Sequence, residues 1–233
     1  MLCAYETGPV YSGVECSTPP VSVSSFKVRL YSDIFYIILN SSSVLTIASG
    51  NQKKVSEILE MLDVLSLKVK KQPEHLNVEE TGKTYFDNAF LKAKAASLET
   101  KTWALADDSG LEVDYLDGRP GIYSARYAKN NDEKLIKLIG ELSDIPYRSA
   151  KFISCMVLCD PEGNLVKDAT GICWGEILKE PKYPNGEFES IFWVKEANCV
   201  YGELSHSQLS KLGSRGKAAK NIAPFLKREF GID

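Results

Sequence analysis

Short apolar runs alternate with amphipathic stretches along most of this chain. Residues 44–48 form an apolar, β-branched run, which predicts a buried strand. Apolar side chains then recur at helical spacing over residues 55–62 and predict a helix with one buried face. Between the two lies a Ser-Gly-Asn turn. A strand, a turn and a helix in this order present free backbone N–H groups, to which an anion can bind.

The same alternation of apolar runs and amphipathic stretches predicts the helices and strands of the rest of the chain. The remaining predicted helices are 86–93, 135–142, 205–212 and 218–230, and the remaining predicted strands are 103–106, 111–115, 151–158, 165–178 and 191–194. Thr84 is the expected N-cap of the first of these helices, and Pro224 is expected to kink the last. We therefore predict an α/β fold, in which a central mixed sheet is flanked by helices and carries a β-rich lobe. The active site is expected in the cleft between them.

Residues 1–42 differ from the rest in composition. They are rich in Ser, Val and Pro, and their apolar stretch 34–39 is far too short to span a membrane. No basic segment precedes an apolar core near Met1, so a secretory signal is not expected, and Glu6 and Glu15 argue against a transit peptide. We predict a partly disordered extension without an assigned function, followed by one domain over residues 43–233.

Composition narrows the function classes. The chain has 233 residues and a net charge of −3, which suits one α/β domain and argues against nucleic-acid or membrane partners. Its six cysteines form no CxxC pair, which indicates reduced thiols and a cytoplasmic protein. With only two histidines, a His-based zinc site is nearly excluded. Any metal would bind to carboxylate and phosphate oxygens, which favours Mg²⁺.

Two adjacent carboxylates, Asp107 and Asp108, follow an apolar run at residues 104–106. Carboxylates at the exit of a buried strand are costly unless a cation or a proton-transfer role compensates. Side chains alternate along a strand, so the two should point to opposite faces, one toward a site and the other toward the turn. The alternative interpretation is a polar strand end in an Asp-Ser-Gly turn.

Three further segments accompany this pair: residues 44–54 (VLTIASGNQKK), 79–94 (EETGKTYFDNAFLKAK) and 214–218 (SRGKA). Together with the segments around Asp108 and at 120–127, this set resembles the inosine triphosphate pyrophosphatase family over residues 43–230. The resemblance implies hydrolysis of aberrant purine nucleoside triphosphates, including deoxy forms, to monophosphate and pyrophosphate. It also implies Mg²⁺ dependence and a homodimer.

Site roles follow from the resemblance residue by residue. It implies triphosphate contacts for Ser49, Asn51 and Lys54, a phosphate or substrate contact for Lys92 and a substrate contact for Ser109. It implies a metal site at Glu80 and Asp108, with Asp108 also the general base. From the residues alone, the lysines at 53 and 54 could equally form a solvated helix face, and residues 79–82 an acidic loop. Arg126 is interpreted either as a phosphate clamp or as a surface or dimer-interface residue.

The base-reading segments depart from the family pattern. Family members usually carry Gly-Phe-Gly-Tyr-Asp-Pro, whereas residues 185–190 here read NGEFES, so Phe188 replaces the Tyr and Glu189 replaces the Asp. Ser-His-Arg-Gly becomes Gly-Ser-Arg-Gly, which leaves Ser214 in the histidine position and keeps Arg215. A lysine usual upstream falls on Leu209. We still expect Phe188, Glu189, Ser214 and Arg215 to contact the substrate, in a modified base pocket.

Three functions remain open on these grounds. The first is a Mg²⁺-dependent nucleoside triphosphate pyrophosphatase that acts on (deoxy)nucleoside triphosphates of the inosine or xanthosine type. The second is a nucleotide- or phosphate-binding protein of the same fold with little or no turnover, which the altered base pocket favours. The third is hydrolysis of another phosphorylated substrate on the same scaffold.

Overall fold

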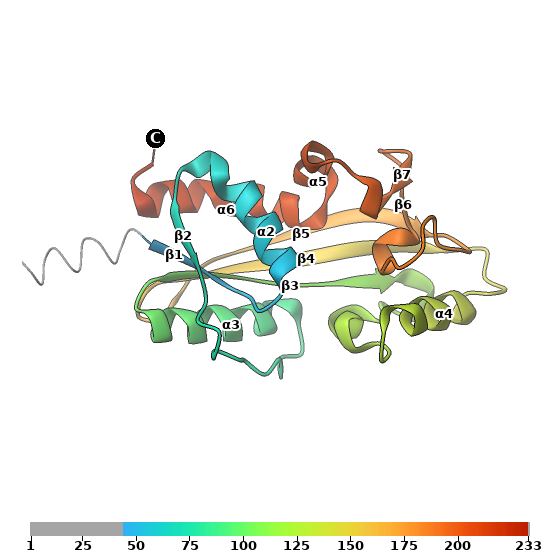
Figure 1. The fold of residues 1–233 in the computed structure, drawn as a ribbon, viewed down its shortest axis with the longest axis horizontal. Coiled ribbons are helices and arrows are strands. Elements are labelled where there is room, and N and C mark those ends of the chain that lie inside the picture. Colours follow the sequence, from blue (N-terminus) through green and yellow to red (C-terminus); the bar gives the residue numbers. More distant parts are fainter. Residues whose placement is uncertain (1–43, 233) are drawn as a thin grey trace, which may run out of the picture. The chain divides into compact units, whose positions relative to one another are not determined.

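A seven-stranded mixed sheet forms the centre of the described part of the protein, residues 44–232 of a computed structural model (Figure 1). The strand order is β2 (Lys68–Lys71), β1 (Val44–Ala48), β3 (Trp103–Val113), β4 (Ser149–Cys159), β5 (Leu165–Ile177), β6 (Phe192–Val194) and β7 (Cys199–Val200). The first three strands run parallel, and the pairs from β3 onward are antiparallel. The predicted α/β fold with a mixed sheet is confirmed. The predicted extension, residues 1–42, lies outside the described residues.

Helices cover both faces of the sheet. They are α2 (Gln52–Leu62), α3 (Tyr85–Thr100), α4 (Asn131–Glu141), α5 (His206–Leu212) and α6 (Ser214–Phe230). Figure 1 shows α2, α5 and α6 on one face and α3 and α4 on the other. Short 3₁₀ turns join these elements at η1 (Asp63–Leu65), η2 (Asp114–Leu116), η3 (Gly121–Arg126), η4 (Phe188–Ser190) and η5 (Tyr201–Glu203).

The two faces of the sheet are packed differently. Large aliphatic residues of α2 and α6, such as Ile58 and Ile222, pack on β1 and β3. On the opposite face, alanines of α3 such as Ala89 and Ala93 meet Ala104 and Ala106 of β3. Small side chains allow a helix to approach a sheet closely, because little volume separates the two backbones. The side chains of α3 are therefore brought near the centre of β3.

One element differs clearly from its prediction. The turn expected between strands 103–106 and 111–115 is absent from the structure, and β3 is continuous over 11 residues. The strand β1 stops pairing with β3 at Ala106, whereas β4 pairs with β3 from Ala104 to Val113. Asp107 and Asp108 thus lie in mid-strand, at the point where one neighbouring strand ends. The long antiparallel partner, which local sequence does not reveal, keeps this Asp-Ser-Gly segment extended.

The β-rich part is a continuation of the same sheet. The far halves of β3, β4 and β5, together with β6 and β7, enclose a second apolar core that includes Leu111, Leu138 and Phe192. Helix α6 begins at Ser214, four positions before the predicted start, because Gly213 already takes the extended N-cap conformation. The helix runs past Pro224 to Phe230.

Thr84 caps α3 as predicted, within a reciprocal capping box with Asp87. The four cysteines of the described residues are free thiols, and Cys155, Cys159 and Cys173 are buried. Among the residues that the structure describes, no helix combines the length and apolarity that a membrane span requires.

Candidate functional site

A cavity of about 850 Å³ opens between the end of β1, the middle of β3 and the η4 segment. Every residue that the sequence assigned to the site lines this cavity: Ser49, Asn51, Lys54, Glu80, Lys92, Asp108, Ser109, Arg126, Phe188, Glu189, Ser214 and Arg215. They come from segments spread over most of the domain, so the fold alone brings them together. Their individual roles remain predictions.

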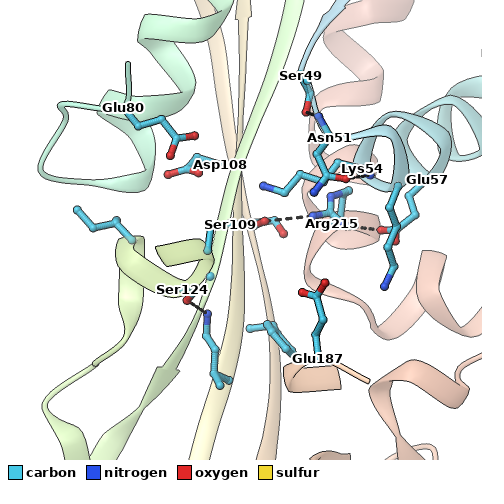
Figure 2. A pocket seen from close by; sticks show the side chains of 18 of the residues that line it. Ser49, Asn51, Lys54, Glu57, Glu80, Asp108, Ser109, Ser124, Glu187 and Arg215 are labelled. Carbon is cyan, nitrogen blue, oxygen red and sulfur yellow. Dashed lines mark hydrogen bonds and ion pairs between the residues drawn. The ribbon is translucent and has the colours of Figure 1, made fainter. Parts of the chain in front are cut away.

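The first wall is the turn between β1 and α2. The Ser49 hydroxyl accepts a hydrogen bond from the backbone nitrogen of Asn51 at 3.2 Å, and the Asn51 side chain accepts one from the backbone nitrogen of Lys54 at 3.2 Å. These bonds fix the conformation of the turn, and Asn51 is the N-cap of α2. Figure 2 shows Ser49, Asn51 and Lys54 grouped at this end of the cavity. The predicted order of strand, turn and helix is therefore present, with the N–H groups of Asn51 and Lys54 bonded to side chains of the turn, and anion binding there stays a prediction.

The two adjacent aspartates point to opposite faces of β3, as predicted. The Asp107 carboxylate is fully buried on the side of α2 and α6, where Lys54 Nζ lies 3.1 Å away and Arg215 Nη2 lies 3.3 Å away. Burial by itself raises the pKa of Asp107, but the nearby Arg215 and Lys54 charges outweigh it and lower that pKa to about 2. Asp107 is thus a charged structural anchor for two cations of the cavity.

Asp108 faces α3 and the cavity. Its carboxylate accepts a hydrogen bond from the Asn88 side-chain amide at 3.2 Å and lies 3.4 Å from Lys92 Nζ. The same ammonium bonds Glu80 at 2.8 Å and the Asp107 carbonyl at 2.9 Å. Lys92 therefore lies between the two carboxylates assigned to metal, which Figure 2 shows on the same side of the cavity.

The two carboxylates have different acidities. Burial raises the pKa of Asp108, and this effect prevails over the neighbouring Lys92 and Lys54 charges. Burial also raises the pKa of Glu80, but the hydrogen bond and charge of Lys92 prevail and lower it. A buried carboxylate with a raised pKa holds a proton more readily, as a proton acceptor near neutral pH requires.

Glu80 and Asp108 fit a Mg²⁺ ion of the kind that keeps most of its water or phosphate ligands. Mg²⁺ prefers oxygen ligands and is commonly bound by one or two carboxylates together with substrate phosphates. Within residues 44–232 there is no group of three His, Cys, Asp or Glu side chains that could hold a metal. A preformed site made of protein ligands alone is therefore not found there.

Arg126 and Ser109 frame the centre of the cavity. Arg126 Nη1 lies 3.3 Å from Glu80 Oε2 and the residue lines the cavity, while 47% of its side chain is exposed, so its role as a phosphate clamp or as a surface or dimer-interface residue stays a prediction. Ser109 Oγ accepts a hydrogen bond from Arg215 Nη2 at 3.1 Å. Gly110, which follows Ser109 on β3, has no room for a side chain, because a Cβ would lie 2.8 Å from Ser124 Oγ.

The base-reading segments also reach the cavity. Phe188 is buried at its wall, and Glu189 of η4 lies at its edge. Ser214 is buried, and its hydroxyl is 2.9 Å from that of Ser154 on β4. This hydroxyl therefore already has a protein partner.

Sequence reasoning missed several cavity residues. Glu57 pairs with Arg215, and Lys53 pairs with Glu189 at 3.0 Å. The Lys53 side chain is 67% exposed, which agrees with its interpretation as part of a solvated helix face, but its pairing with Glu189 was not predicted. Glu187 and Tyr201 also line the cavity. Glu57 follows Lys54 by three positions and so shares its helix face, a signal that was available, whereas nothing local marks Tyr201.

Comparisons with known proteins agree with this geometry. Residues 45–225 match the model of the Ham1 family. A protein named dITP/XTP pyrophosphatase from Synechococcus sp. (strain CC9311) is 40% identical over 189 residues, which cover 81% of this chain and 92% of that protein.

Solved structures lead to the same family. The structure of a HAM1 protein from Coxiella burnetii matches with a TM-score of 0.72 and 33% identity, over 79% of this chain and 98% of that one. The structure of the Ham1 protein of Staphylococcus aureus matches with a TM-score of 0.70 and 33% identity, over 80% of this chain and 99% of that one. The family model matches most of this chain, and the chain covers nearly the whole length of each of these relatives. The chain therefore belongs to the Ham1 family.

Proposed function

We propose that this protein is a nucleoside triphosphate pyrophosphatase that acts on dITP- and XTP-type substrates and releases the monophosphate and pyrophosphate. The observation that carries the proposal is the convergence of Asp108, Glu80 and Lys92 with the α2 N-terminus on one cavity. The curated relative named dITP/XTP pyrophosphatase supports the substrate class.

The cavity supplies what triphosphate hydrolysis requires. In this proposal the turn at Asn51 and the ammonium of Lys54 bind phosphate oxygens, and Lys92 and Arg126 add positive charge to the same cavity. Water attacks the α-phosphorus, the bond to the bridging oxygen of the β-phosphate breaks, and pyrophosphate leaves. Asp108 accepts the proton of the attacking water, a role that suits its position and its raised pKa.

Glu80 and Asp108 would hold Mg²⁺ together with the substrate phosphates. When bound, the ion would neutralise charge on the phosphates and favour loss of a proton from water. Lys92 then has a second role in this proposal, because its ammonium keeps the two carboxylates near one another before substrate arrives.

A product assay tests the function and the metal together. The purified protein is incubated with inosine, xanthosine, adenosine and guanosine triphosphates, each with Mg²⁺ or with EDTA, and the products are identified. We expect monophosphate and pyrophosphate from the first two substrates, and only with Mg²⁺. Tight nucleotide binding without turnover would favour the alternative, a binding protein of this fold. Release of single phosphate would contradict the proposed bond cleavage.

The homodimer and the cytoplasmic location implied by the sequence stay predictions. The mass of the purified protein in solution tests the first.

A further inference from the structure

Three aromatic side chains line the cavity. Phe152, Phe188 and Tyr201 come from β4, η4 and η5, and the ring centroids of Phe152 and Tyr201 lie 4.9 Å apart. Aromatic walls favour a heterocyclic base by stacking and by burial of apolar surface. Selection among bases then depends on the hydrogen-bonding groups that remain free there.

The Ser214 and Arg215 side chains already have hydrogen-bond partners within the protein. The Ser214 hydroxyl is shared with Ser154, and Leu209 supplies no polar group. The Arg215 guanidinium is bound to Glu57, to Asp107 at 3.3 Å and to Ser109 at 3.1 Å. Lys211, the nearest lysine in sequence to Leu209, is absent from the cavity lining of the described residues.

Lys53 differs from Ser214 and Arg215 in the number of hydrogen-bond donors that it keeps free. It extends from the first turn of α2 and lies 3.0 Å from Glu189 of η4, a contact between elements 136 positions apart. Its ammonium uses one donor for this bond and retains two others. Glu189 is partly buried, with 19% of its side chain exposed, so it can fix the position of the ammonium at the cavity.

Acidic residues surround this ammonium on both sides. Glu57 lies on α2, and Glu187 precedes η4 and accepts a hydrogen bond from the Asn131 side chain at 3.0 Å. Burial lowers the pKa of Lys53, but Glu189, Glu57 and Glu187 outweigh it and raise that pKa, so the ammonium stays charged at neutral pH. Figure 2 shows the Glu187 side chain directed into the same space as Ser109 and Arg215.

We propose that Lys53 is a specificity-determining residue: held at the cavity by Glu189, its ammonium donates a hydrogen bond to an oxo group of the substrate base. The proposal rests on the proposed function and adds to it the chemical group that is read. It follows from the position of Lys53 at the cavity, where its ammonium pairs with Glu189 next to Phe188 in η4, and from the existing partners of Ser214 and Arg215.

The chemistry distinguishes oxo from amino bases. An ammonium offers only donors, so it bonds the 6-oxo group of hypoxanthine or xanthine and faces the 6-amino group of adenine donor to donor. A site that leaves a polar group unpaired with the wrong substrate discriminates against that substrate. Lys53 therefore favours inosine and xanthosine nucleotides.

The test compares inosine and adenosine triphosphates in three variants. Lys53→Met keeps the length of the side chain and removes the charge, and Lys53→Arg restores the charge. Lys71→Met is the matched control, because Lys71 is exposed and bonds Gln52 of α2 at 2.7 Å without lining the cavity. For Lys53→Met we expect the ratio of kcat/KM for inosine over adenosine triphosphate to fall about tenfold. Lys53→Arg should recover part of the ratio, and Lys71→Met should leave it unchanged.

Equal losses for both triphosphates would overturn the proposal, since a residue that only bridges the cavity affects every nucleotide alike. An unchanged ratio would overturn it as well. Binding of inosine and adenosine monophosphates to the same variants gives an independent readout. If the wild type hydrolyses no nucleoside triphosphate, the proposed function fails, yet loss of inosine preference in monophosphate binding by Lys53→Met would still support the role of Lys53.

Discussion

Asp107 and Asp108 are adjacent in sequence and have separate roles in the structure. The carboxylate of Asp107 is enclosed between Lys54 and Arg215, whereas that of Asp108 lies beside Asn88 and Lys92 at the cavity. Alternation along β3 is the reason, because successive side chains of a strand point to opposite faces. A substitution at either position should therefore affect a different property.

Asp108→Asn is expected to reduce kcat by about a hundredfold or more, because the amide can neither accept the proton of water nor bind a metal as a carboxylate does. The melting temperature should change little, since Asn fits the same space beside Asn88. Steady-state kinetics and thermal unfolding of the variant check both statements. Near-normal turnover would contradict the assignment of Asp108 as the base.

Asp107→Asn is expected to lower stability in a pH-dependent way. The pKa of Asp107 in the folded protein is about 2, below its ordinary value of 3.8, so its contribution to the free energy of unfolding is complete above about pH 4. That contribution is lost as the pH falls from 4 toward 2, where the folded carboxylate takes up a proton. Urea unfolding of wild type and variant at pH 7 and pH 3 should show a smaller difference at pH 3.

Asp117→Asn, at an exposed position, serves as the control for this experiment. A stability difference for Asp107→Asn that stays constant between pH 7 and pH 3 would show that its charge is not what stabilises the fold.

At the scale of elements, close packing of helices on the sheet places the cavity side chains. Helix α6 crosses β5 at Gly171, where a Cβ atom would lie 2.5 Å from the backbone nitrogen of Ala218 and also too close to the Ser214 carbonyl. Helix α3 approaches the other face through its alanines. The glycine and the alanines thus fix how far Arg215 and Lys92 reach toward β3.

Gly171→Ala is expected to destabilise the protein by about 1–3 kcal/mol, because the added methyl group forces α6 away from β5. It should also lower kcat/KM, because α6 carries Arg215. Gly140→Ala in α4 is the control: no atom lies within 4 Å of its added Cβ. That substitution should stabilise the protein by about 0.5–1 kcal/mol and leave activity unchanged. Equal effects of the two variants would contradict the packing argument.

At the scale of the whole described domain, one sheet carries three apolar clusters and the cavity, and two of these clusters bear on the cavity walls. The core of β1, α2 and α6 supports the phosphate end of the cavity. The core around Leu138 and Phe192 supports η4 and the aromatic walls.

None of the motifs that resemble the family lies in residues 1–42, so a chain that begins at Ser43 is expected to keep the turnover and the melting temperature of the full protein. The two forms are compared by the product assay and by thermal unfolding. Aggregation, or a fall of more than a few degrees in melting temperature, would show that the first 42 residues contribute to the core or to a subunit interface.

The sequence by itself determined the local features of this protein. Helical spacing located α2, a side-chain cap located the start of α3, and strand alternation separated Asp107 from Asp108. These depend on interactions within a few residues or on which side of an element is buried, and a single chain carries both signals. The motif resemblance added the cavity residues, and the structure brings all of them to one cavity.

Only the tertiary structure decided the continuity of β3 and the charge pairs across the cavity. The Asp-Ser-Gly segment looks like a turn until β4 supplies hydrogen-bond partners along its whole length. Lys53 meets Glu189 and Glu57 meets Arg215 across more than 130 positions of chain. Such contacts depend on how the sheet edge and the helices pack, and neighbouring residues carry no information about a partner so distant in sequence.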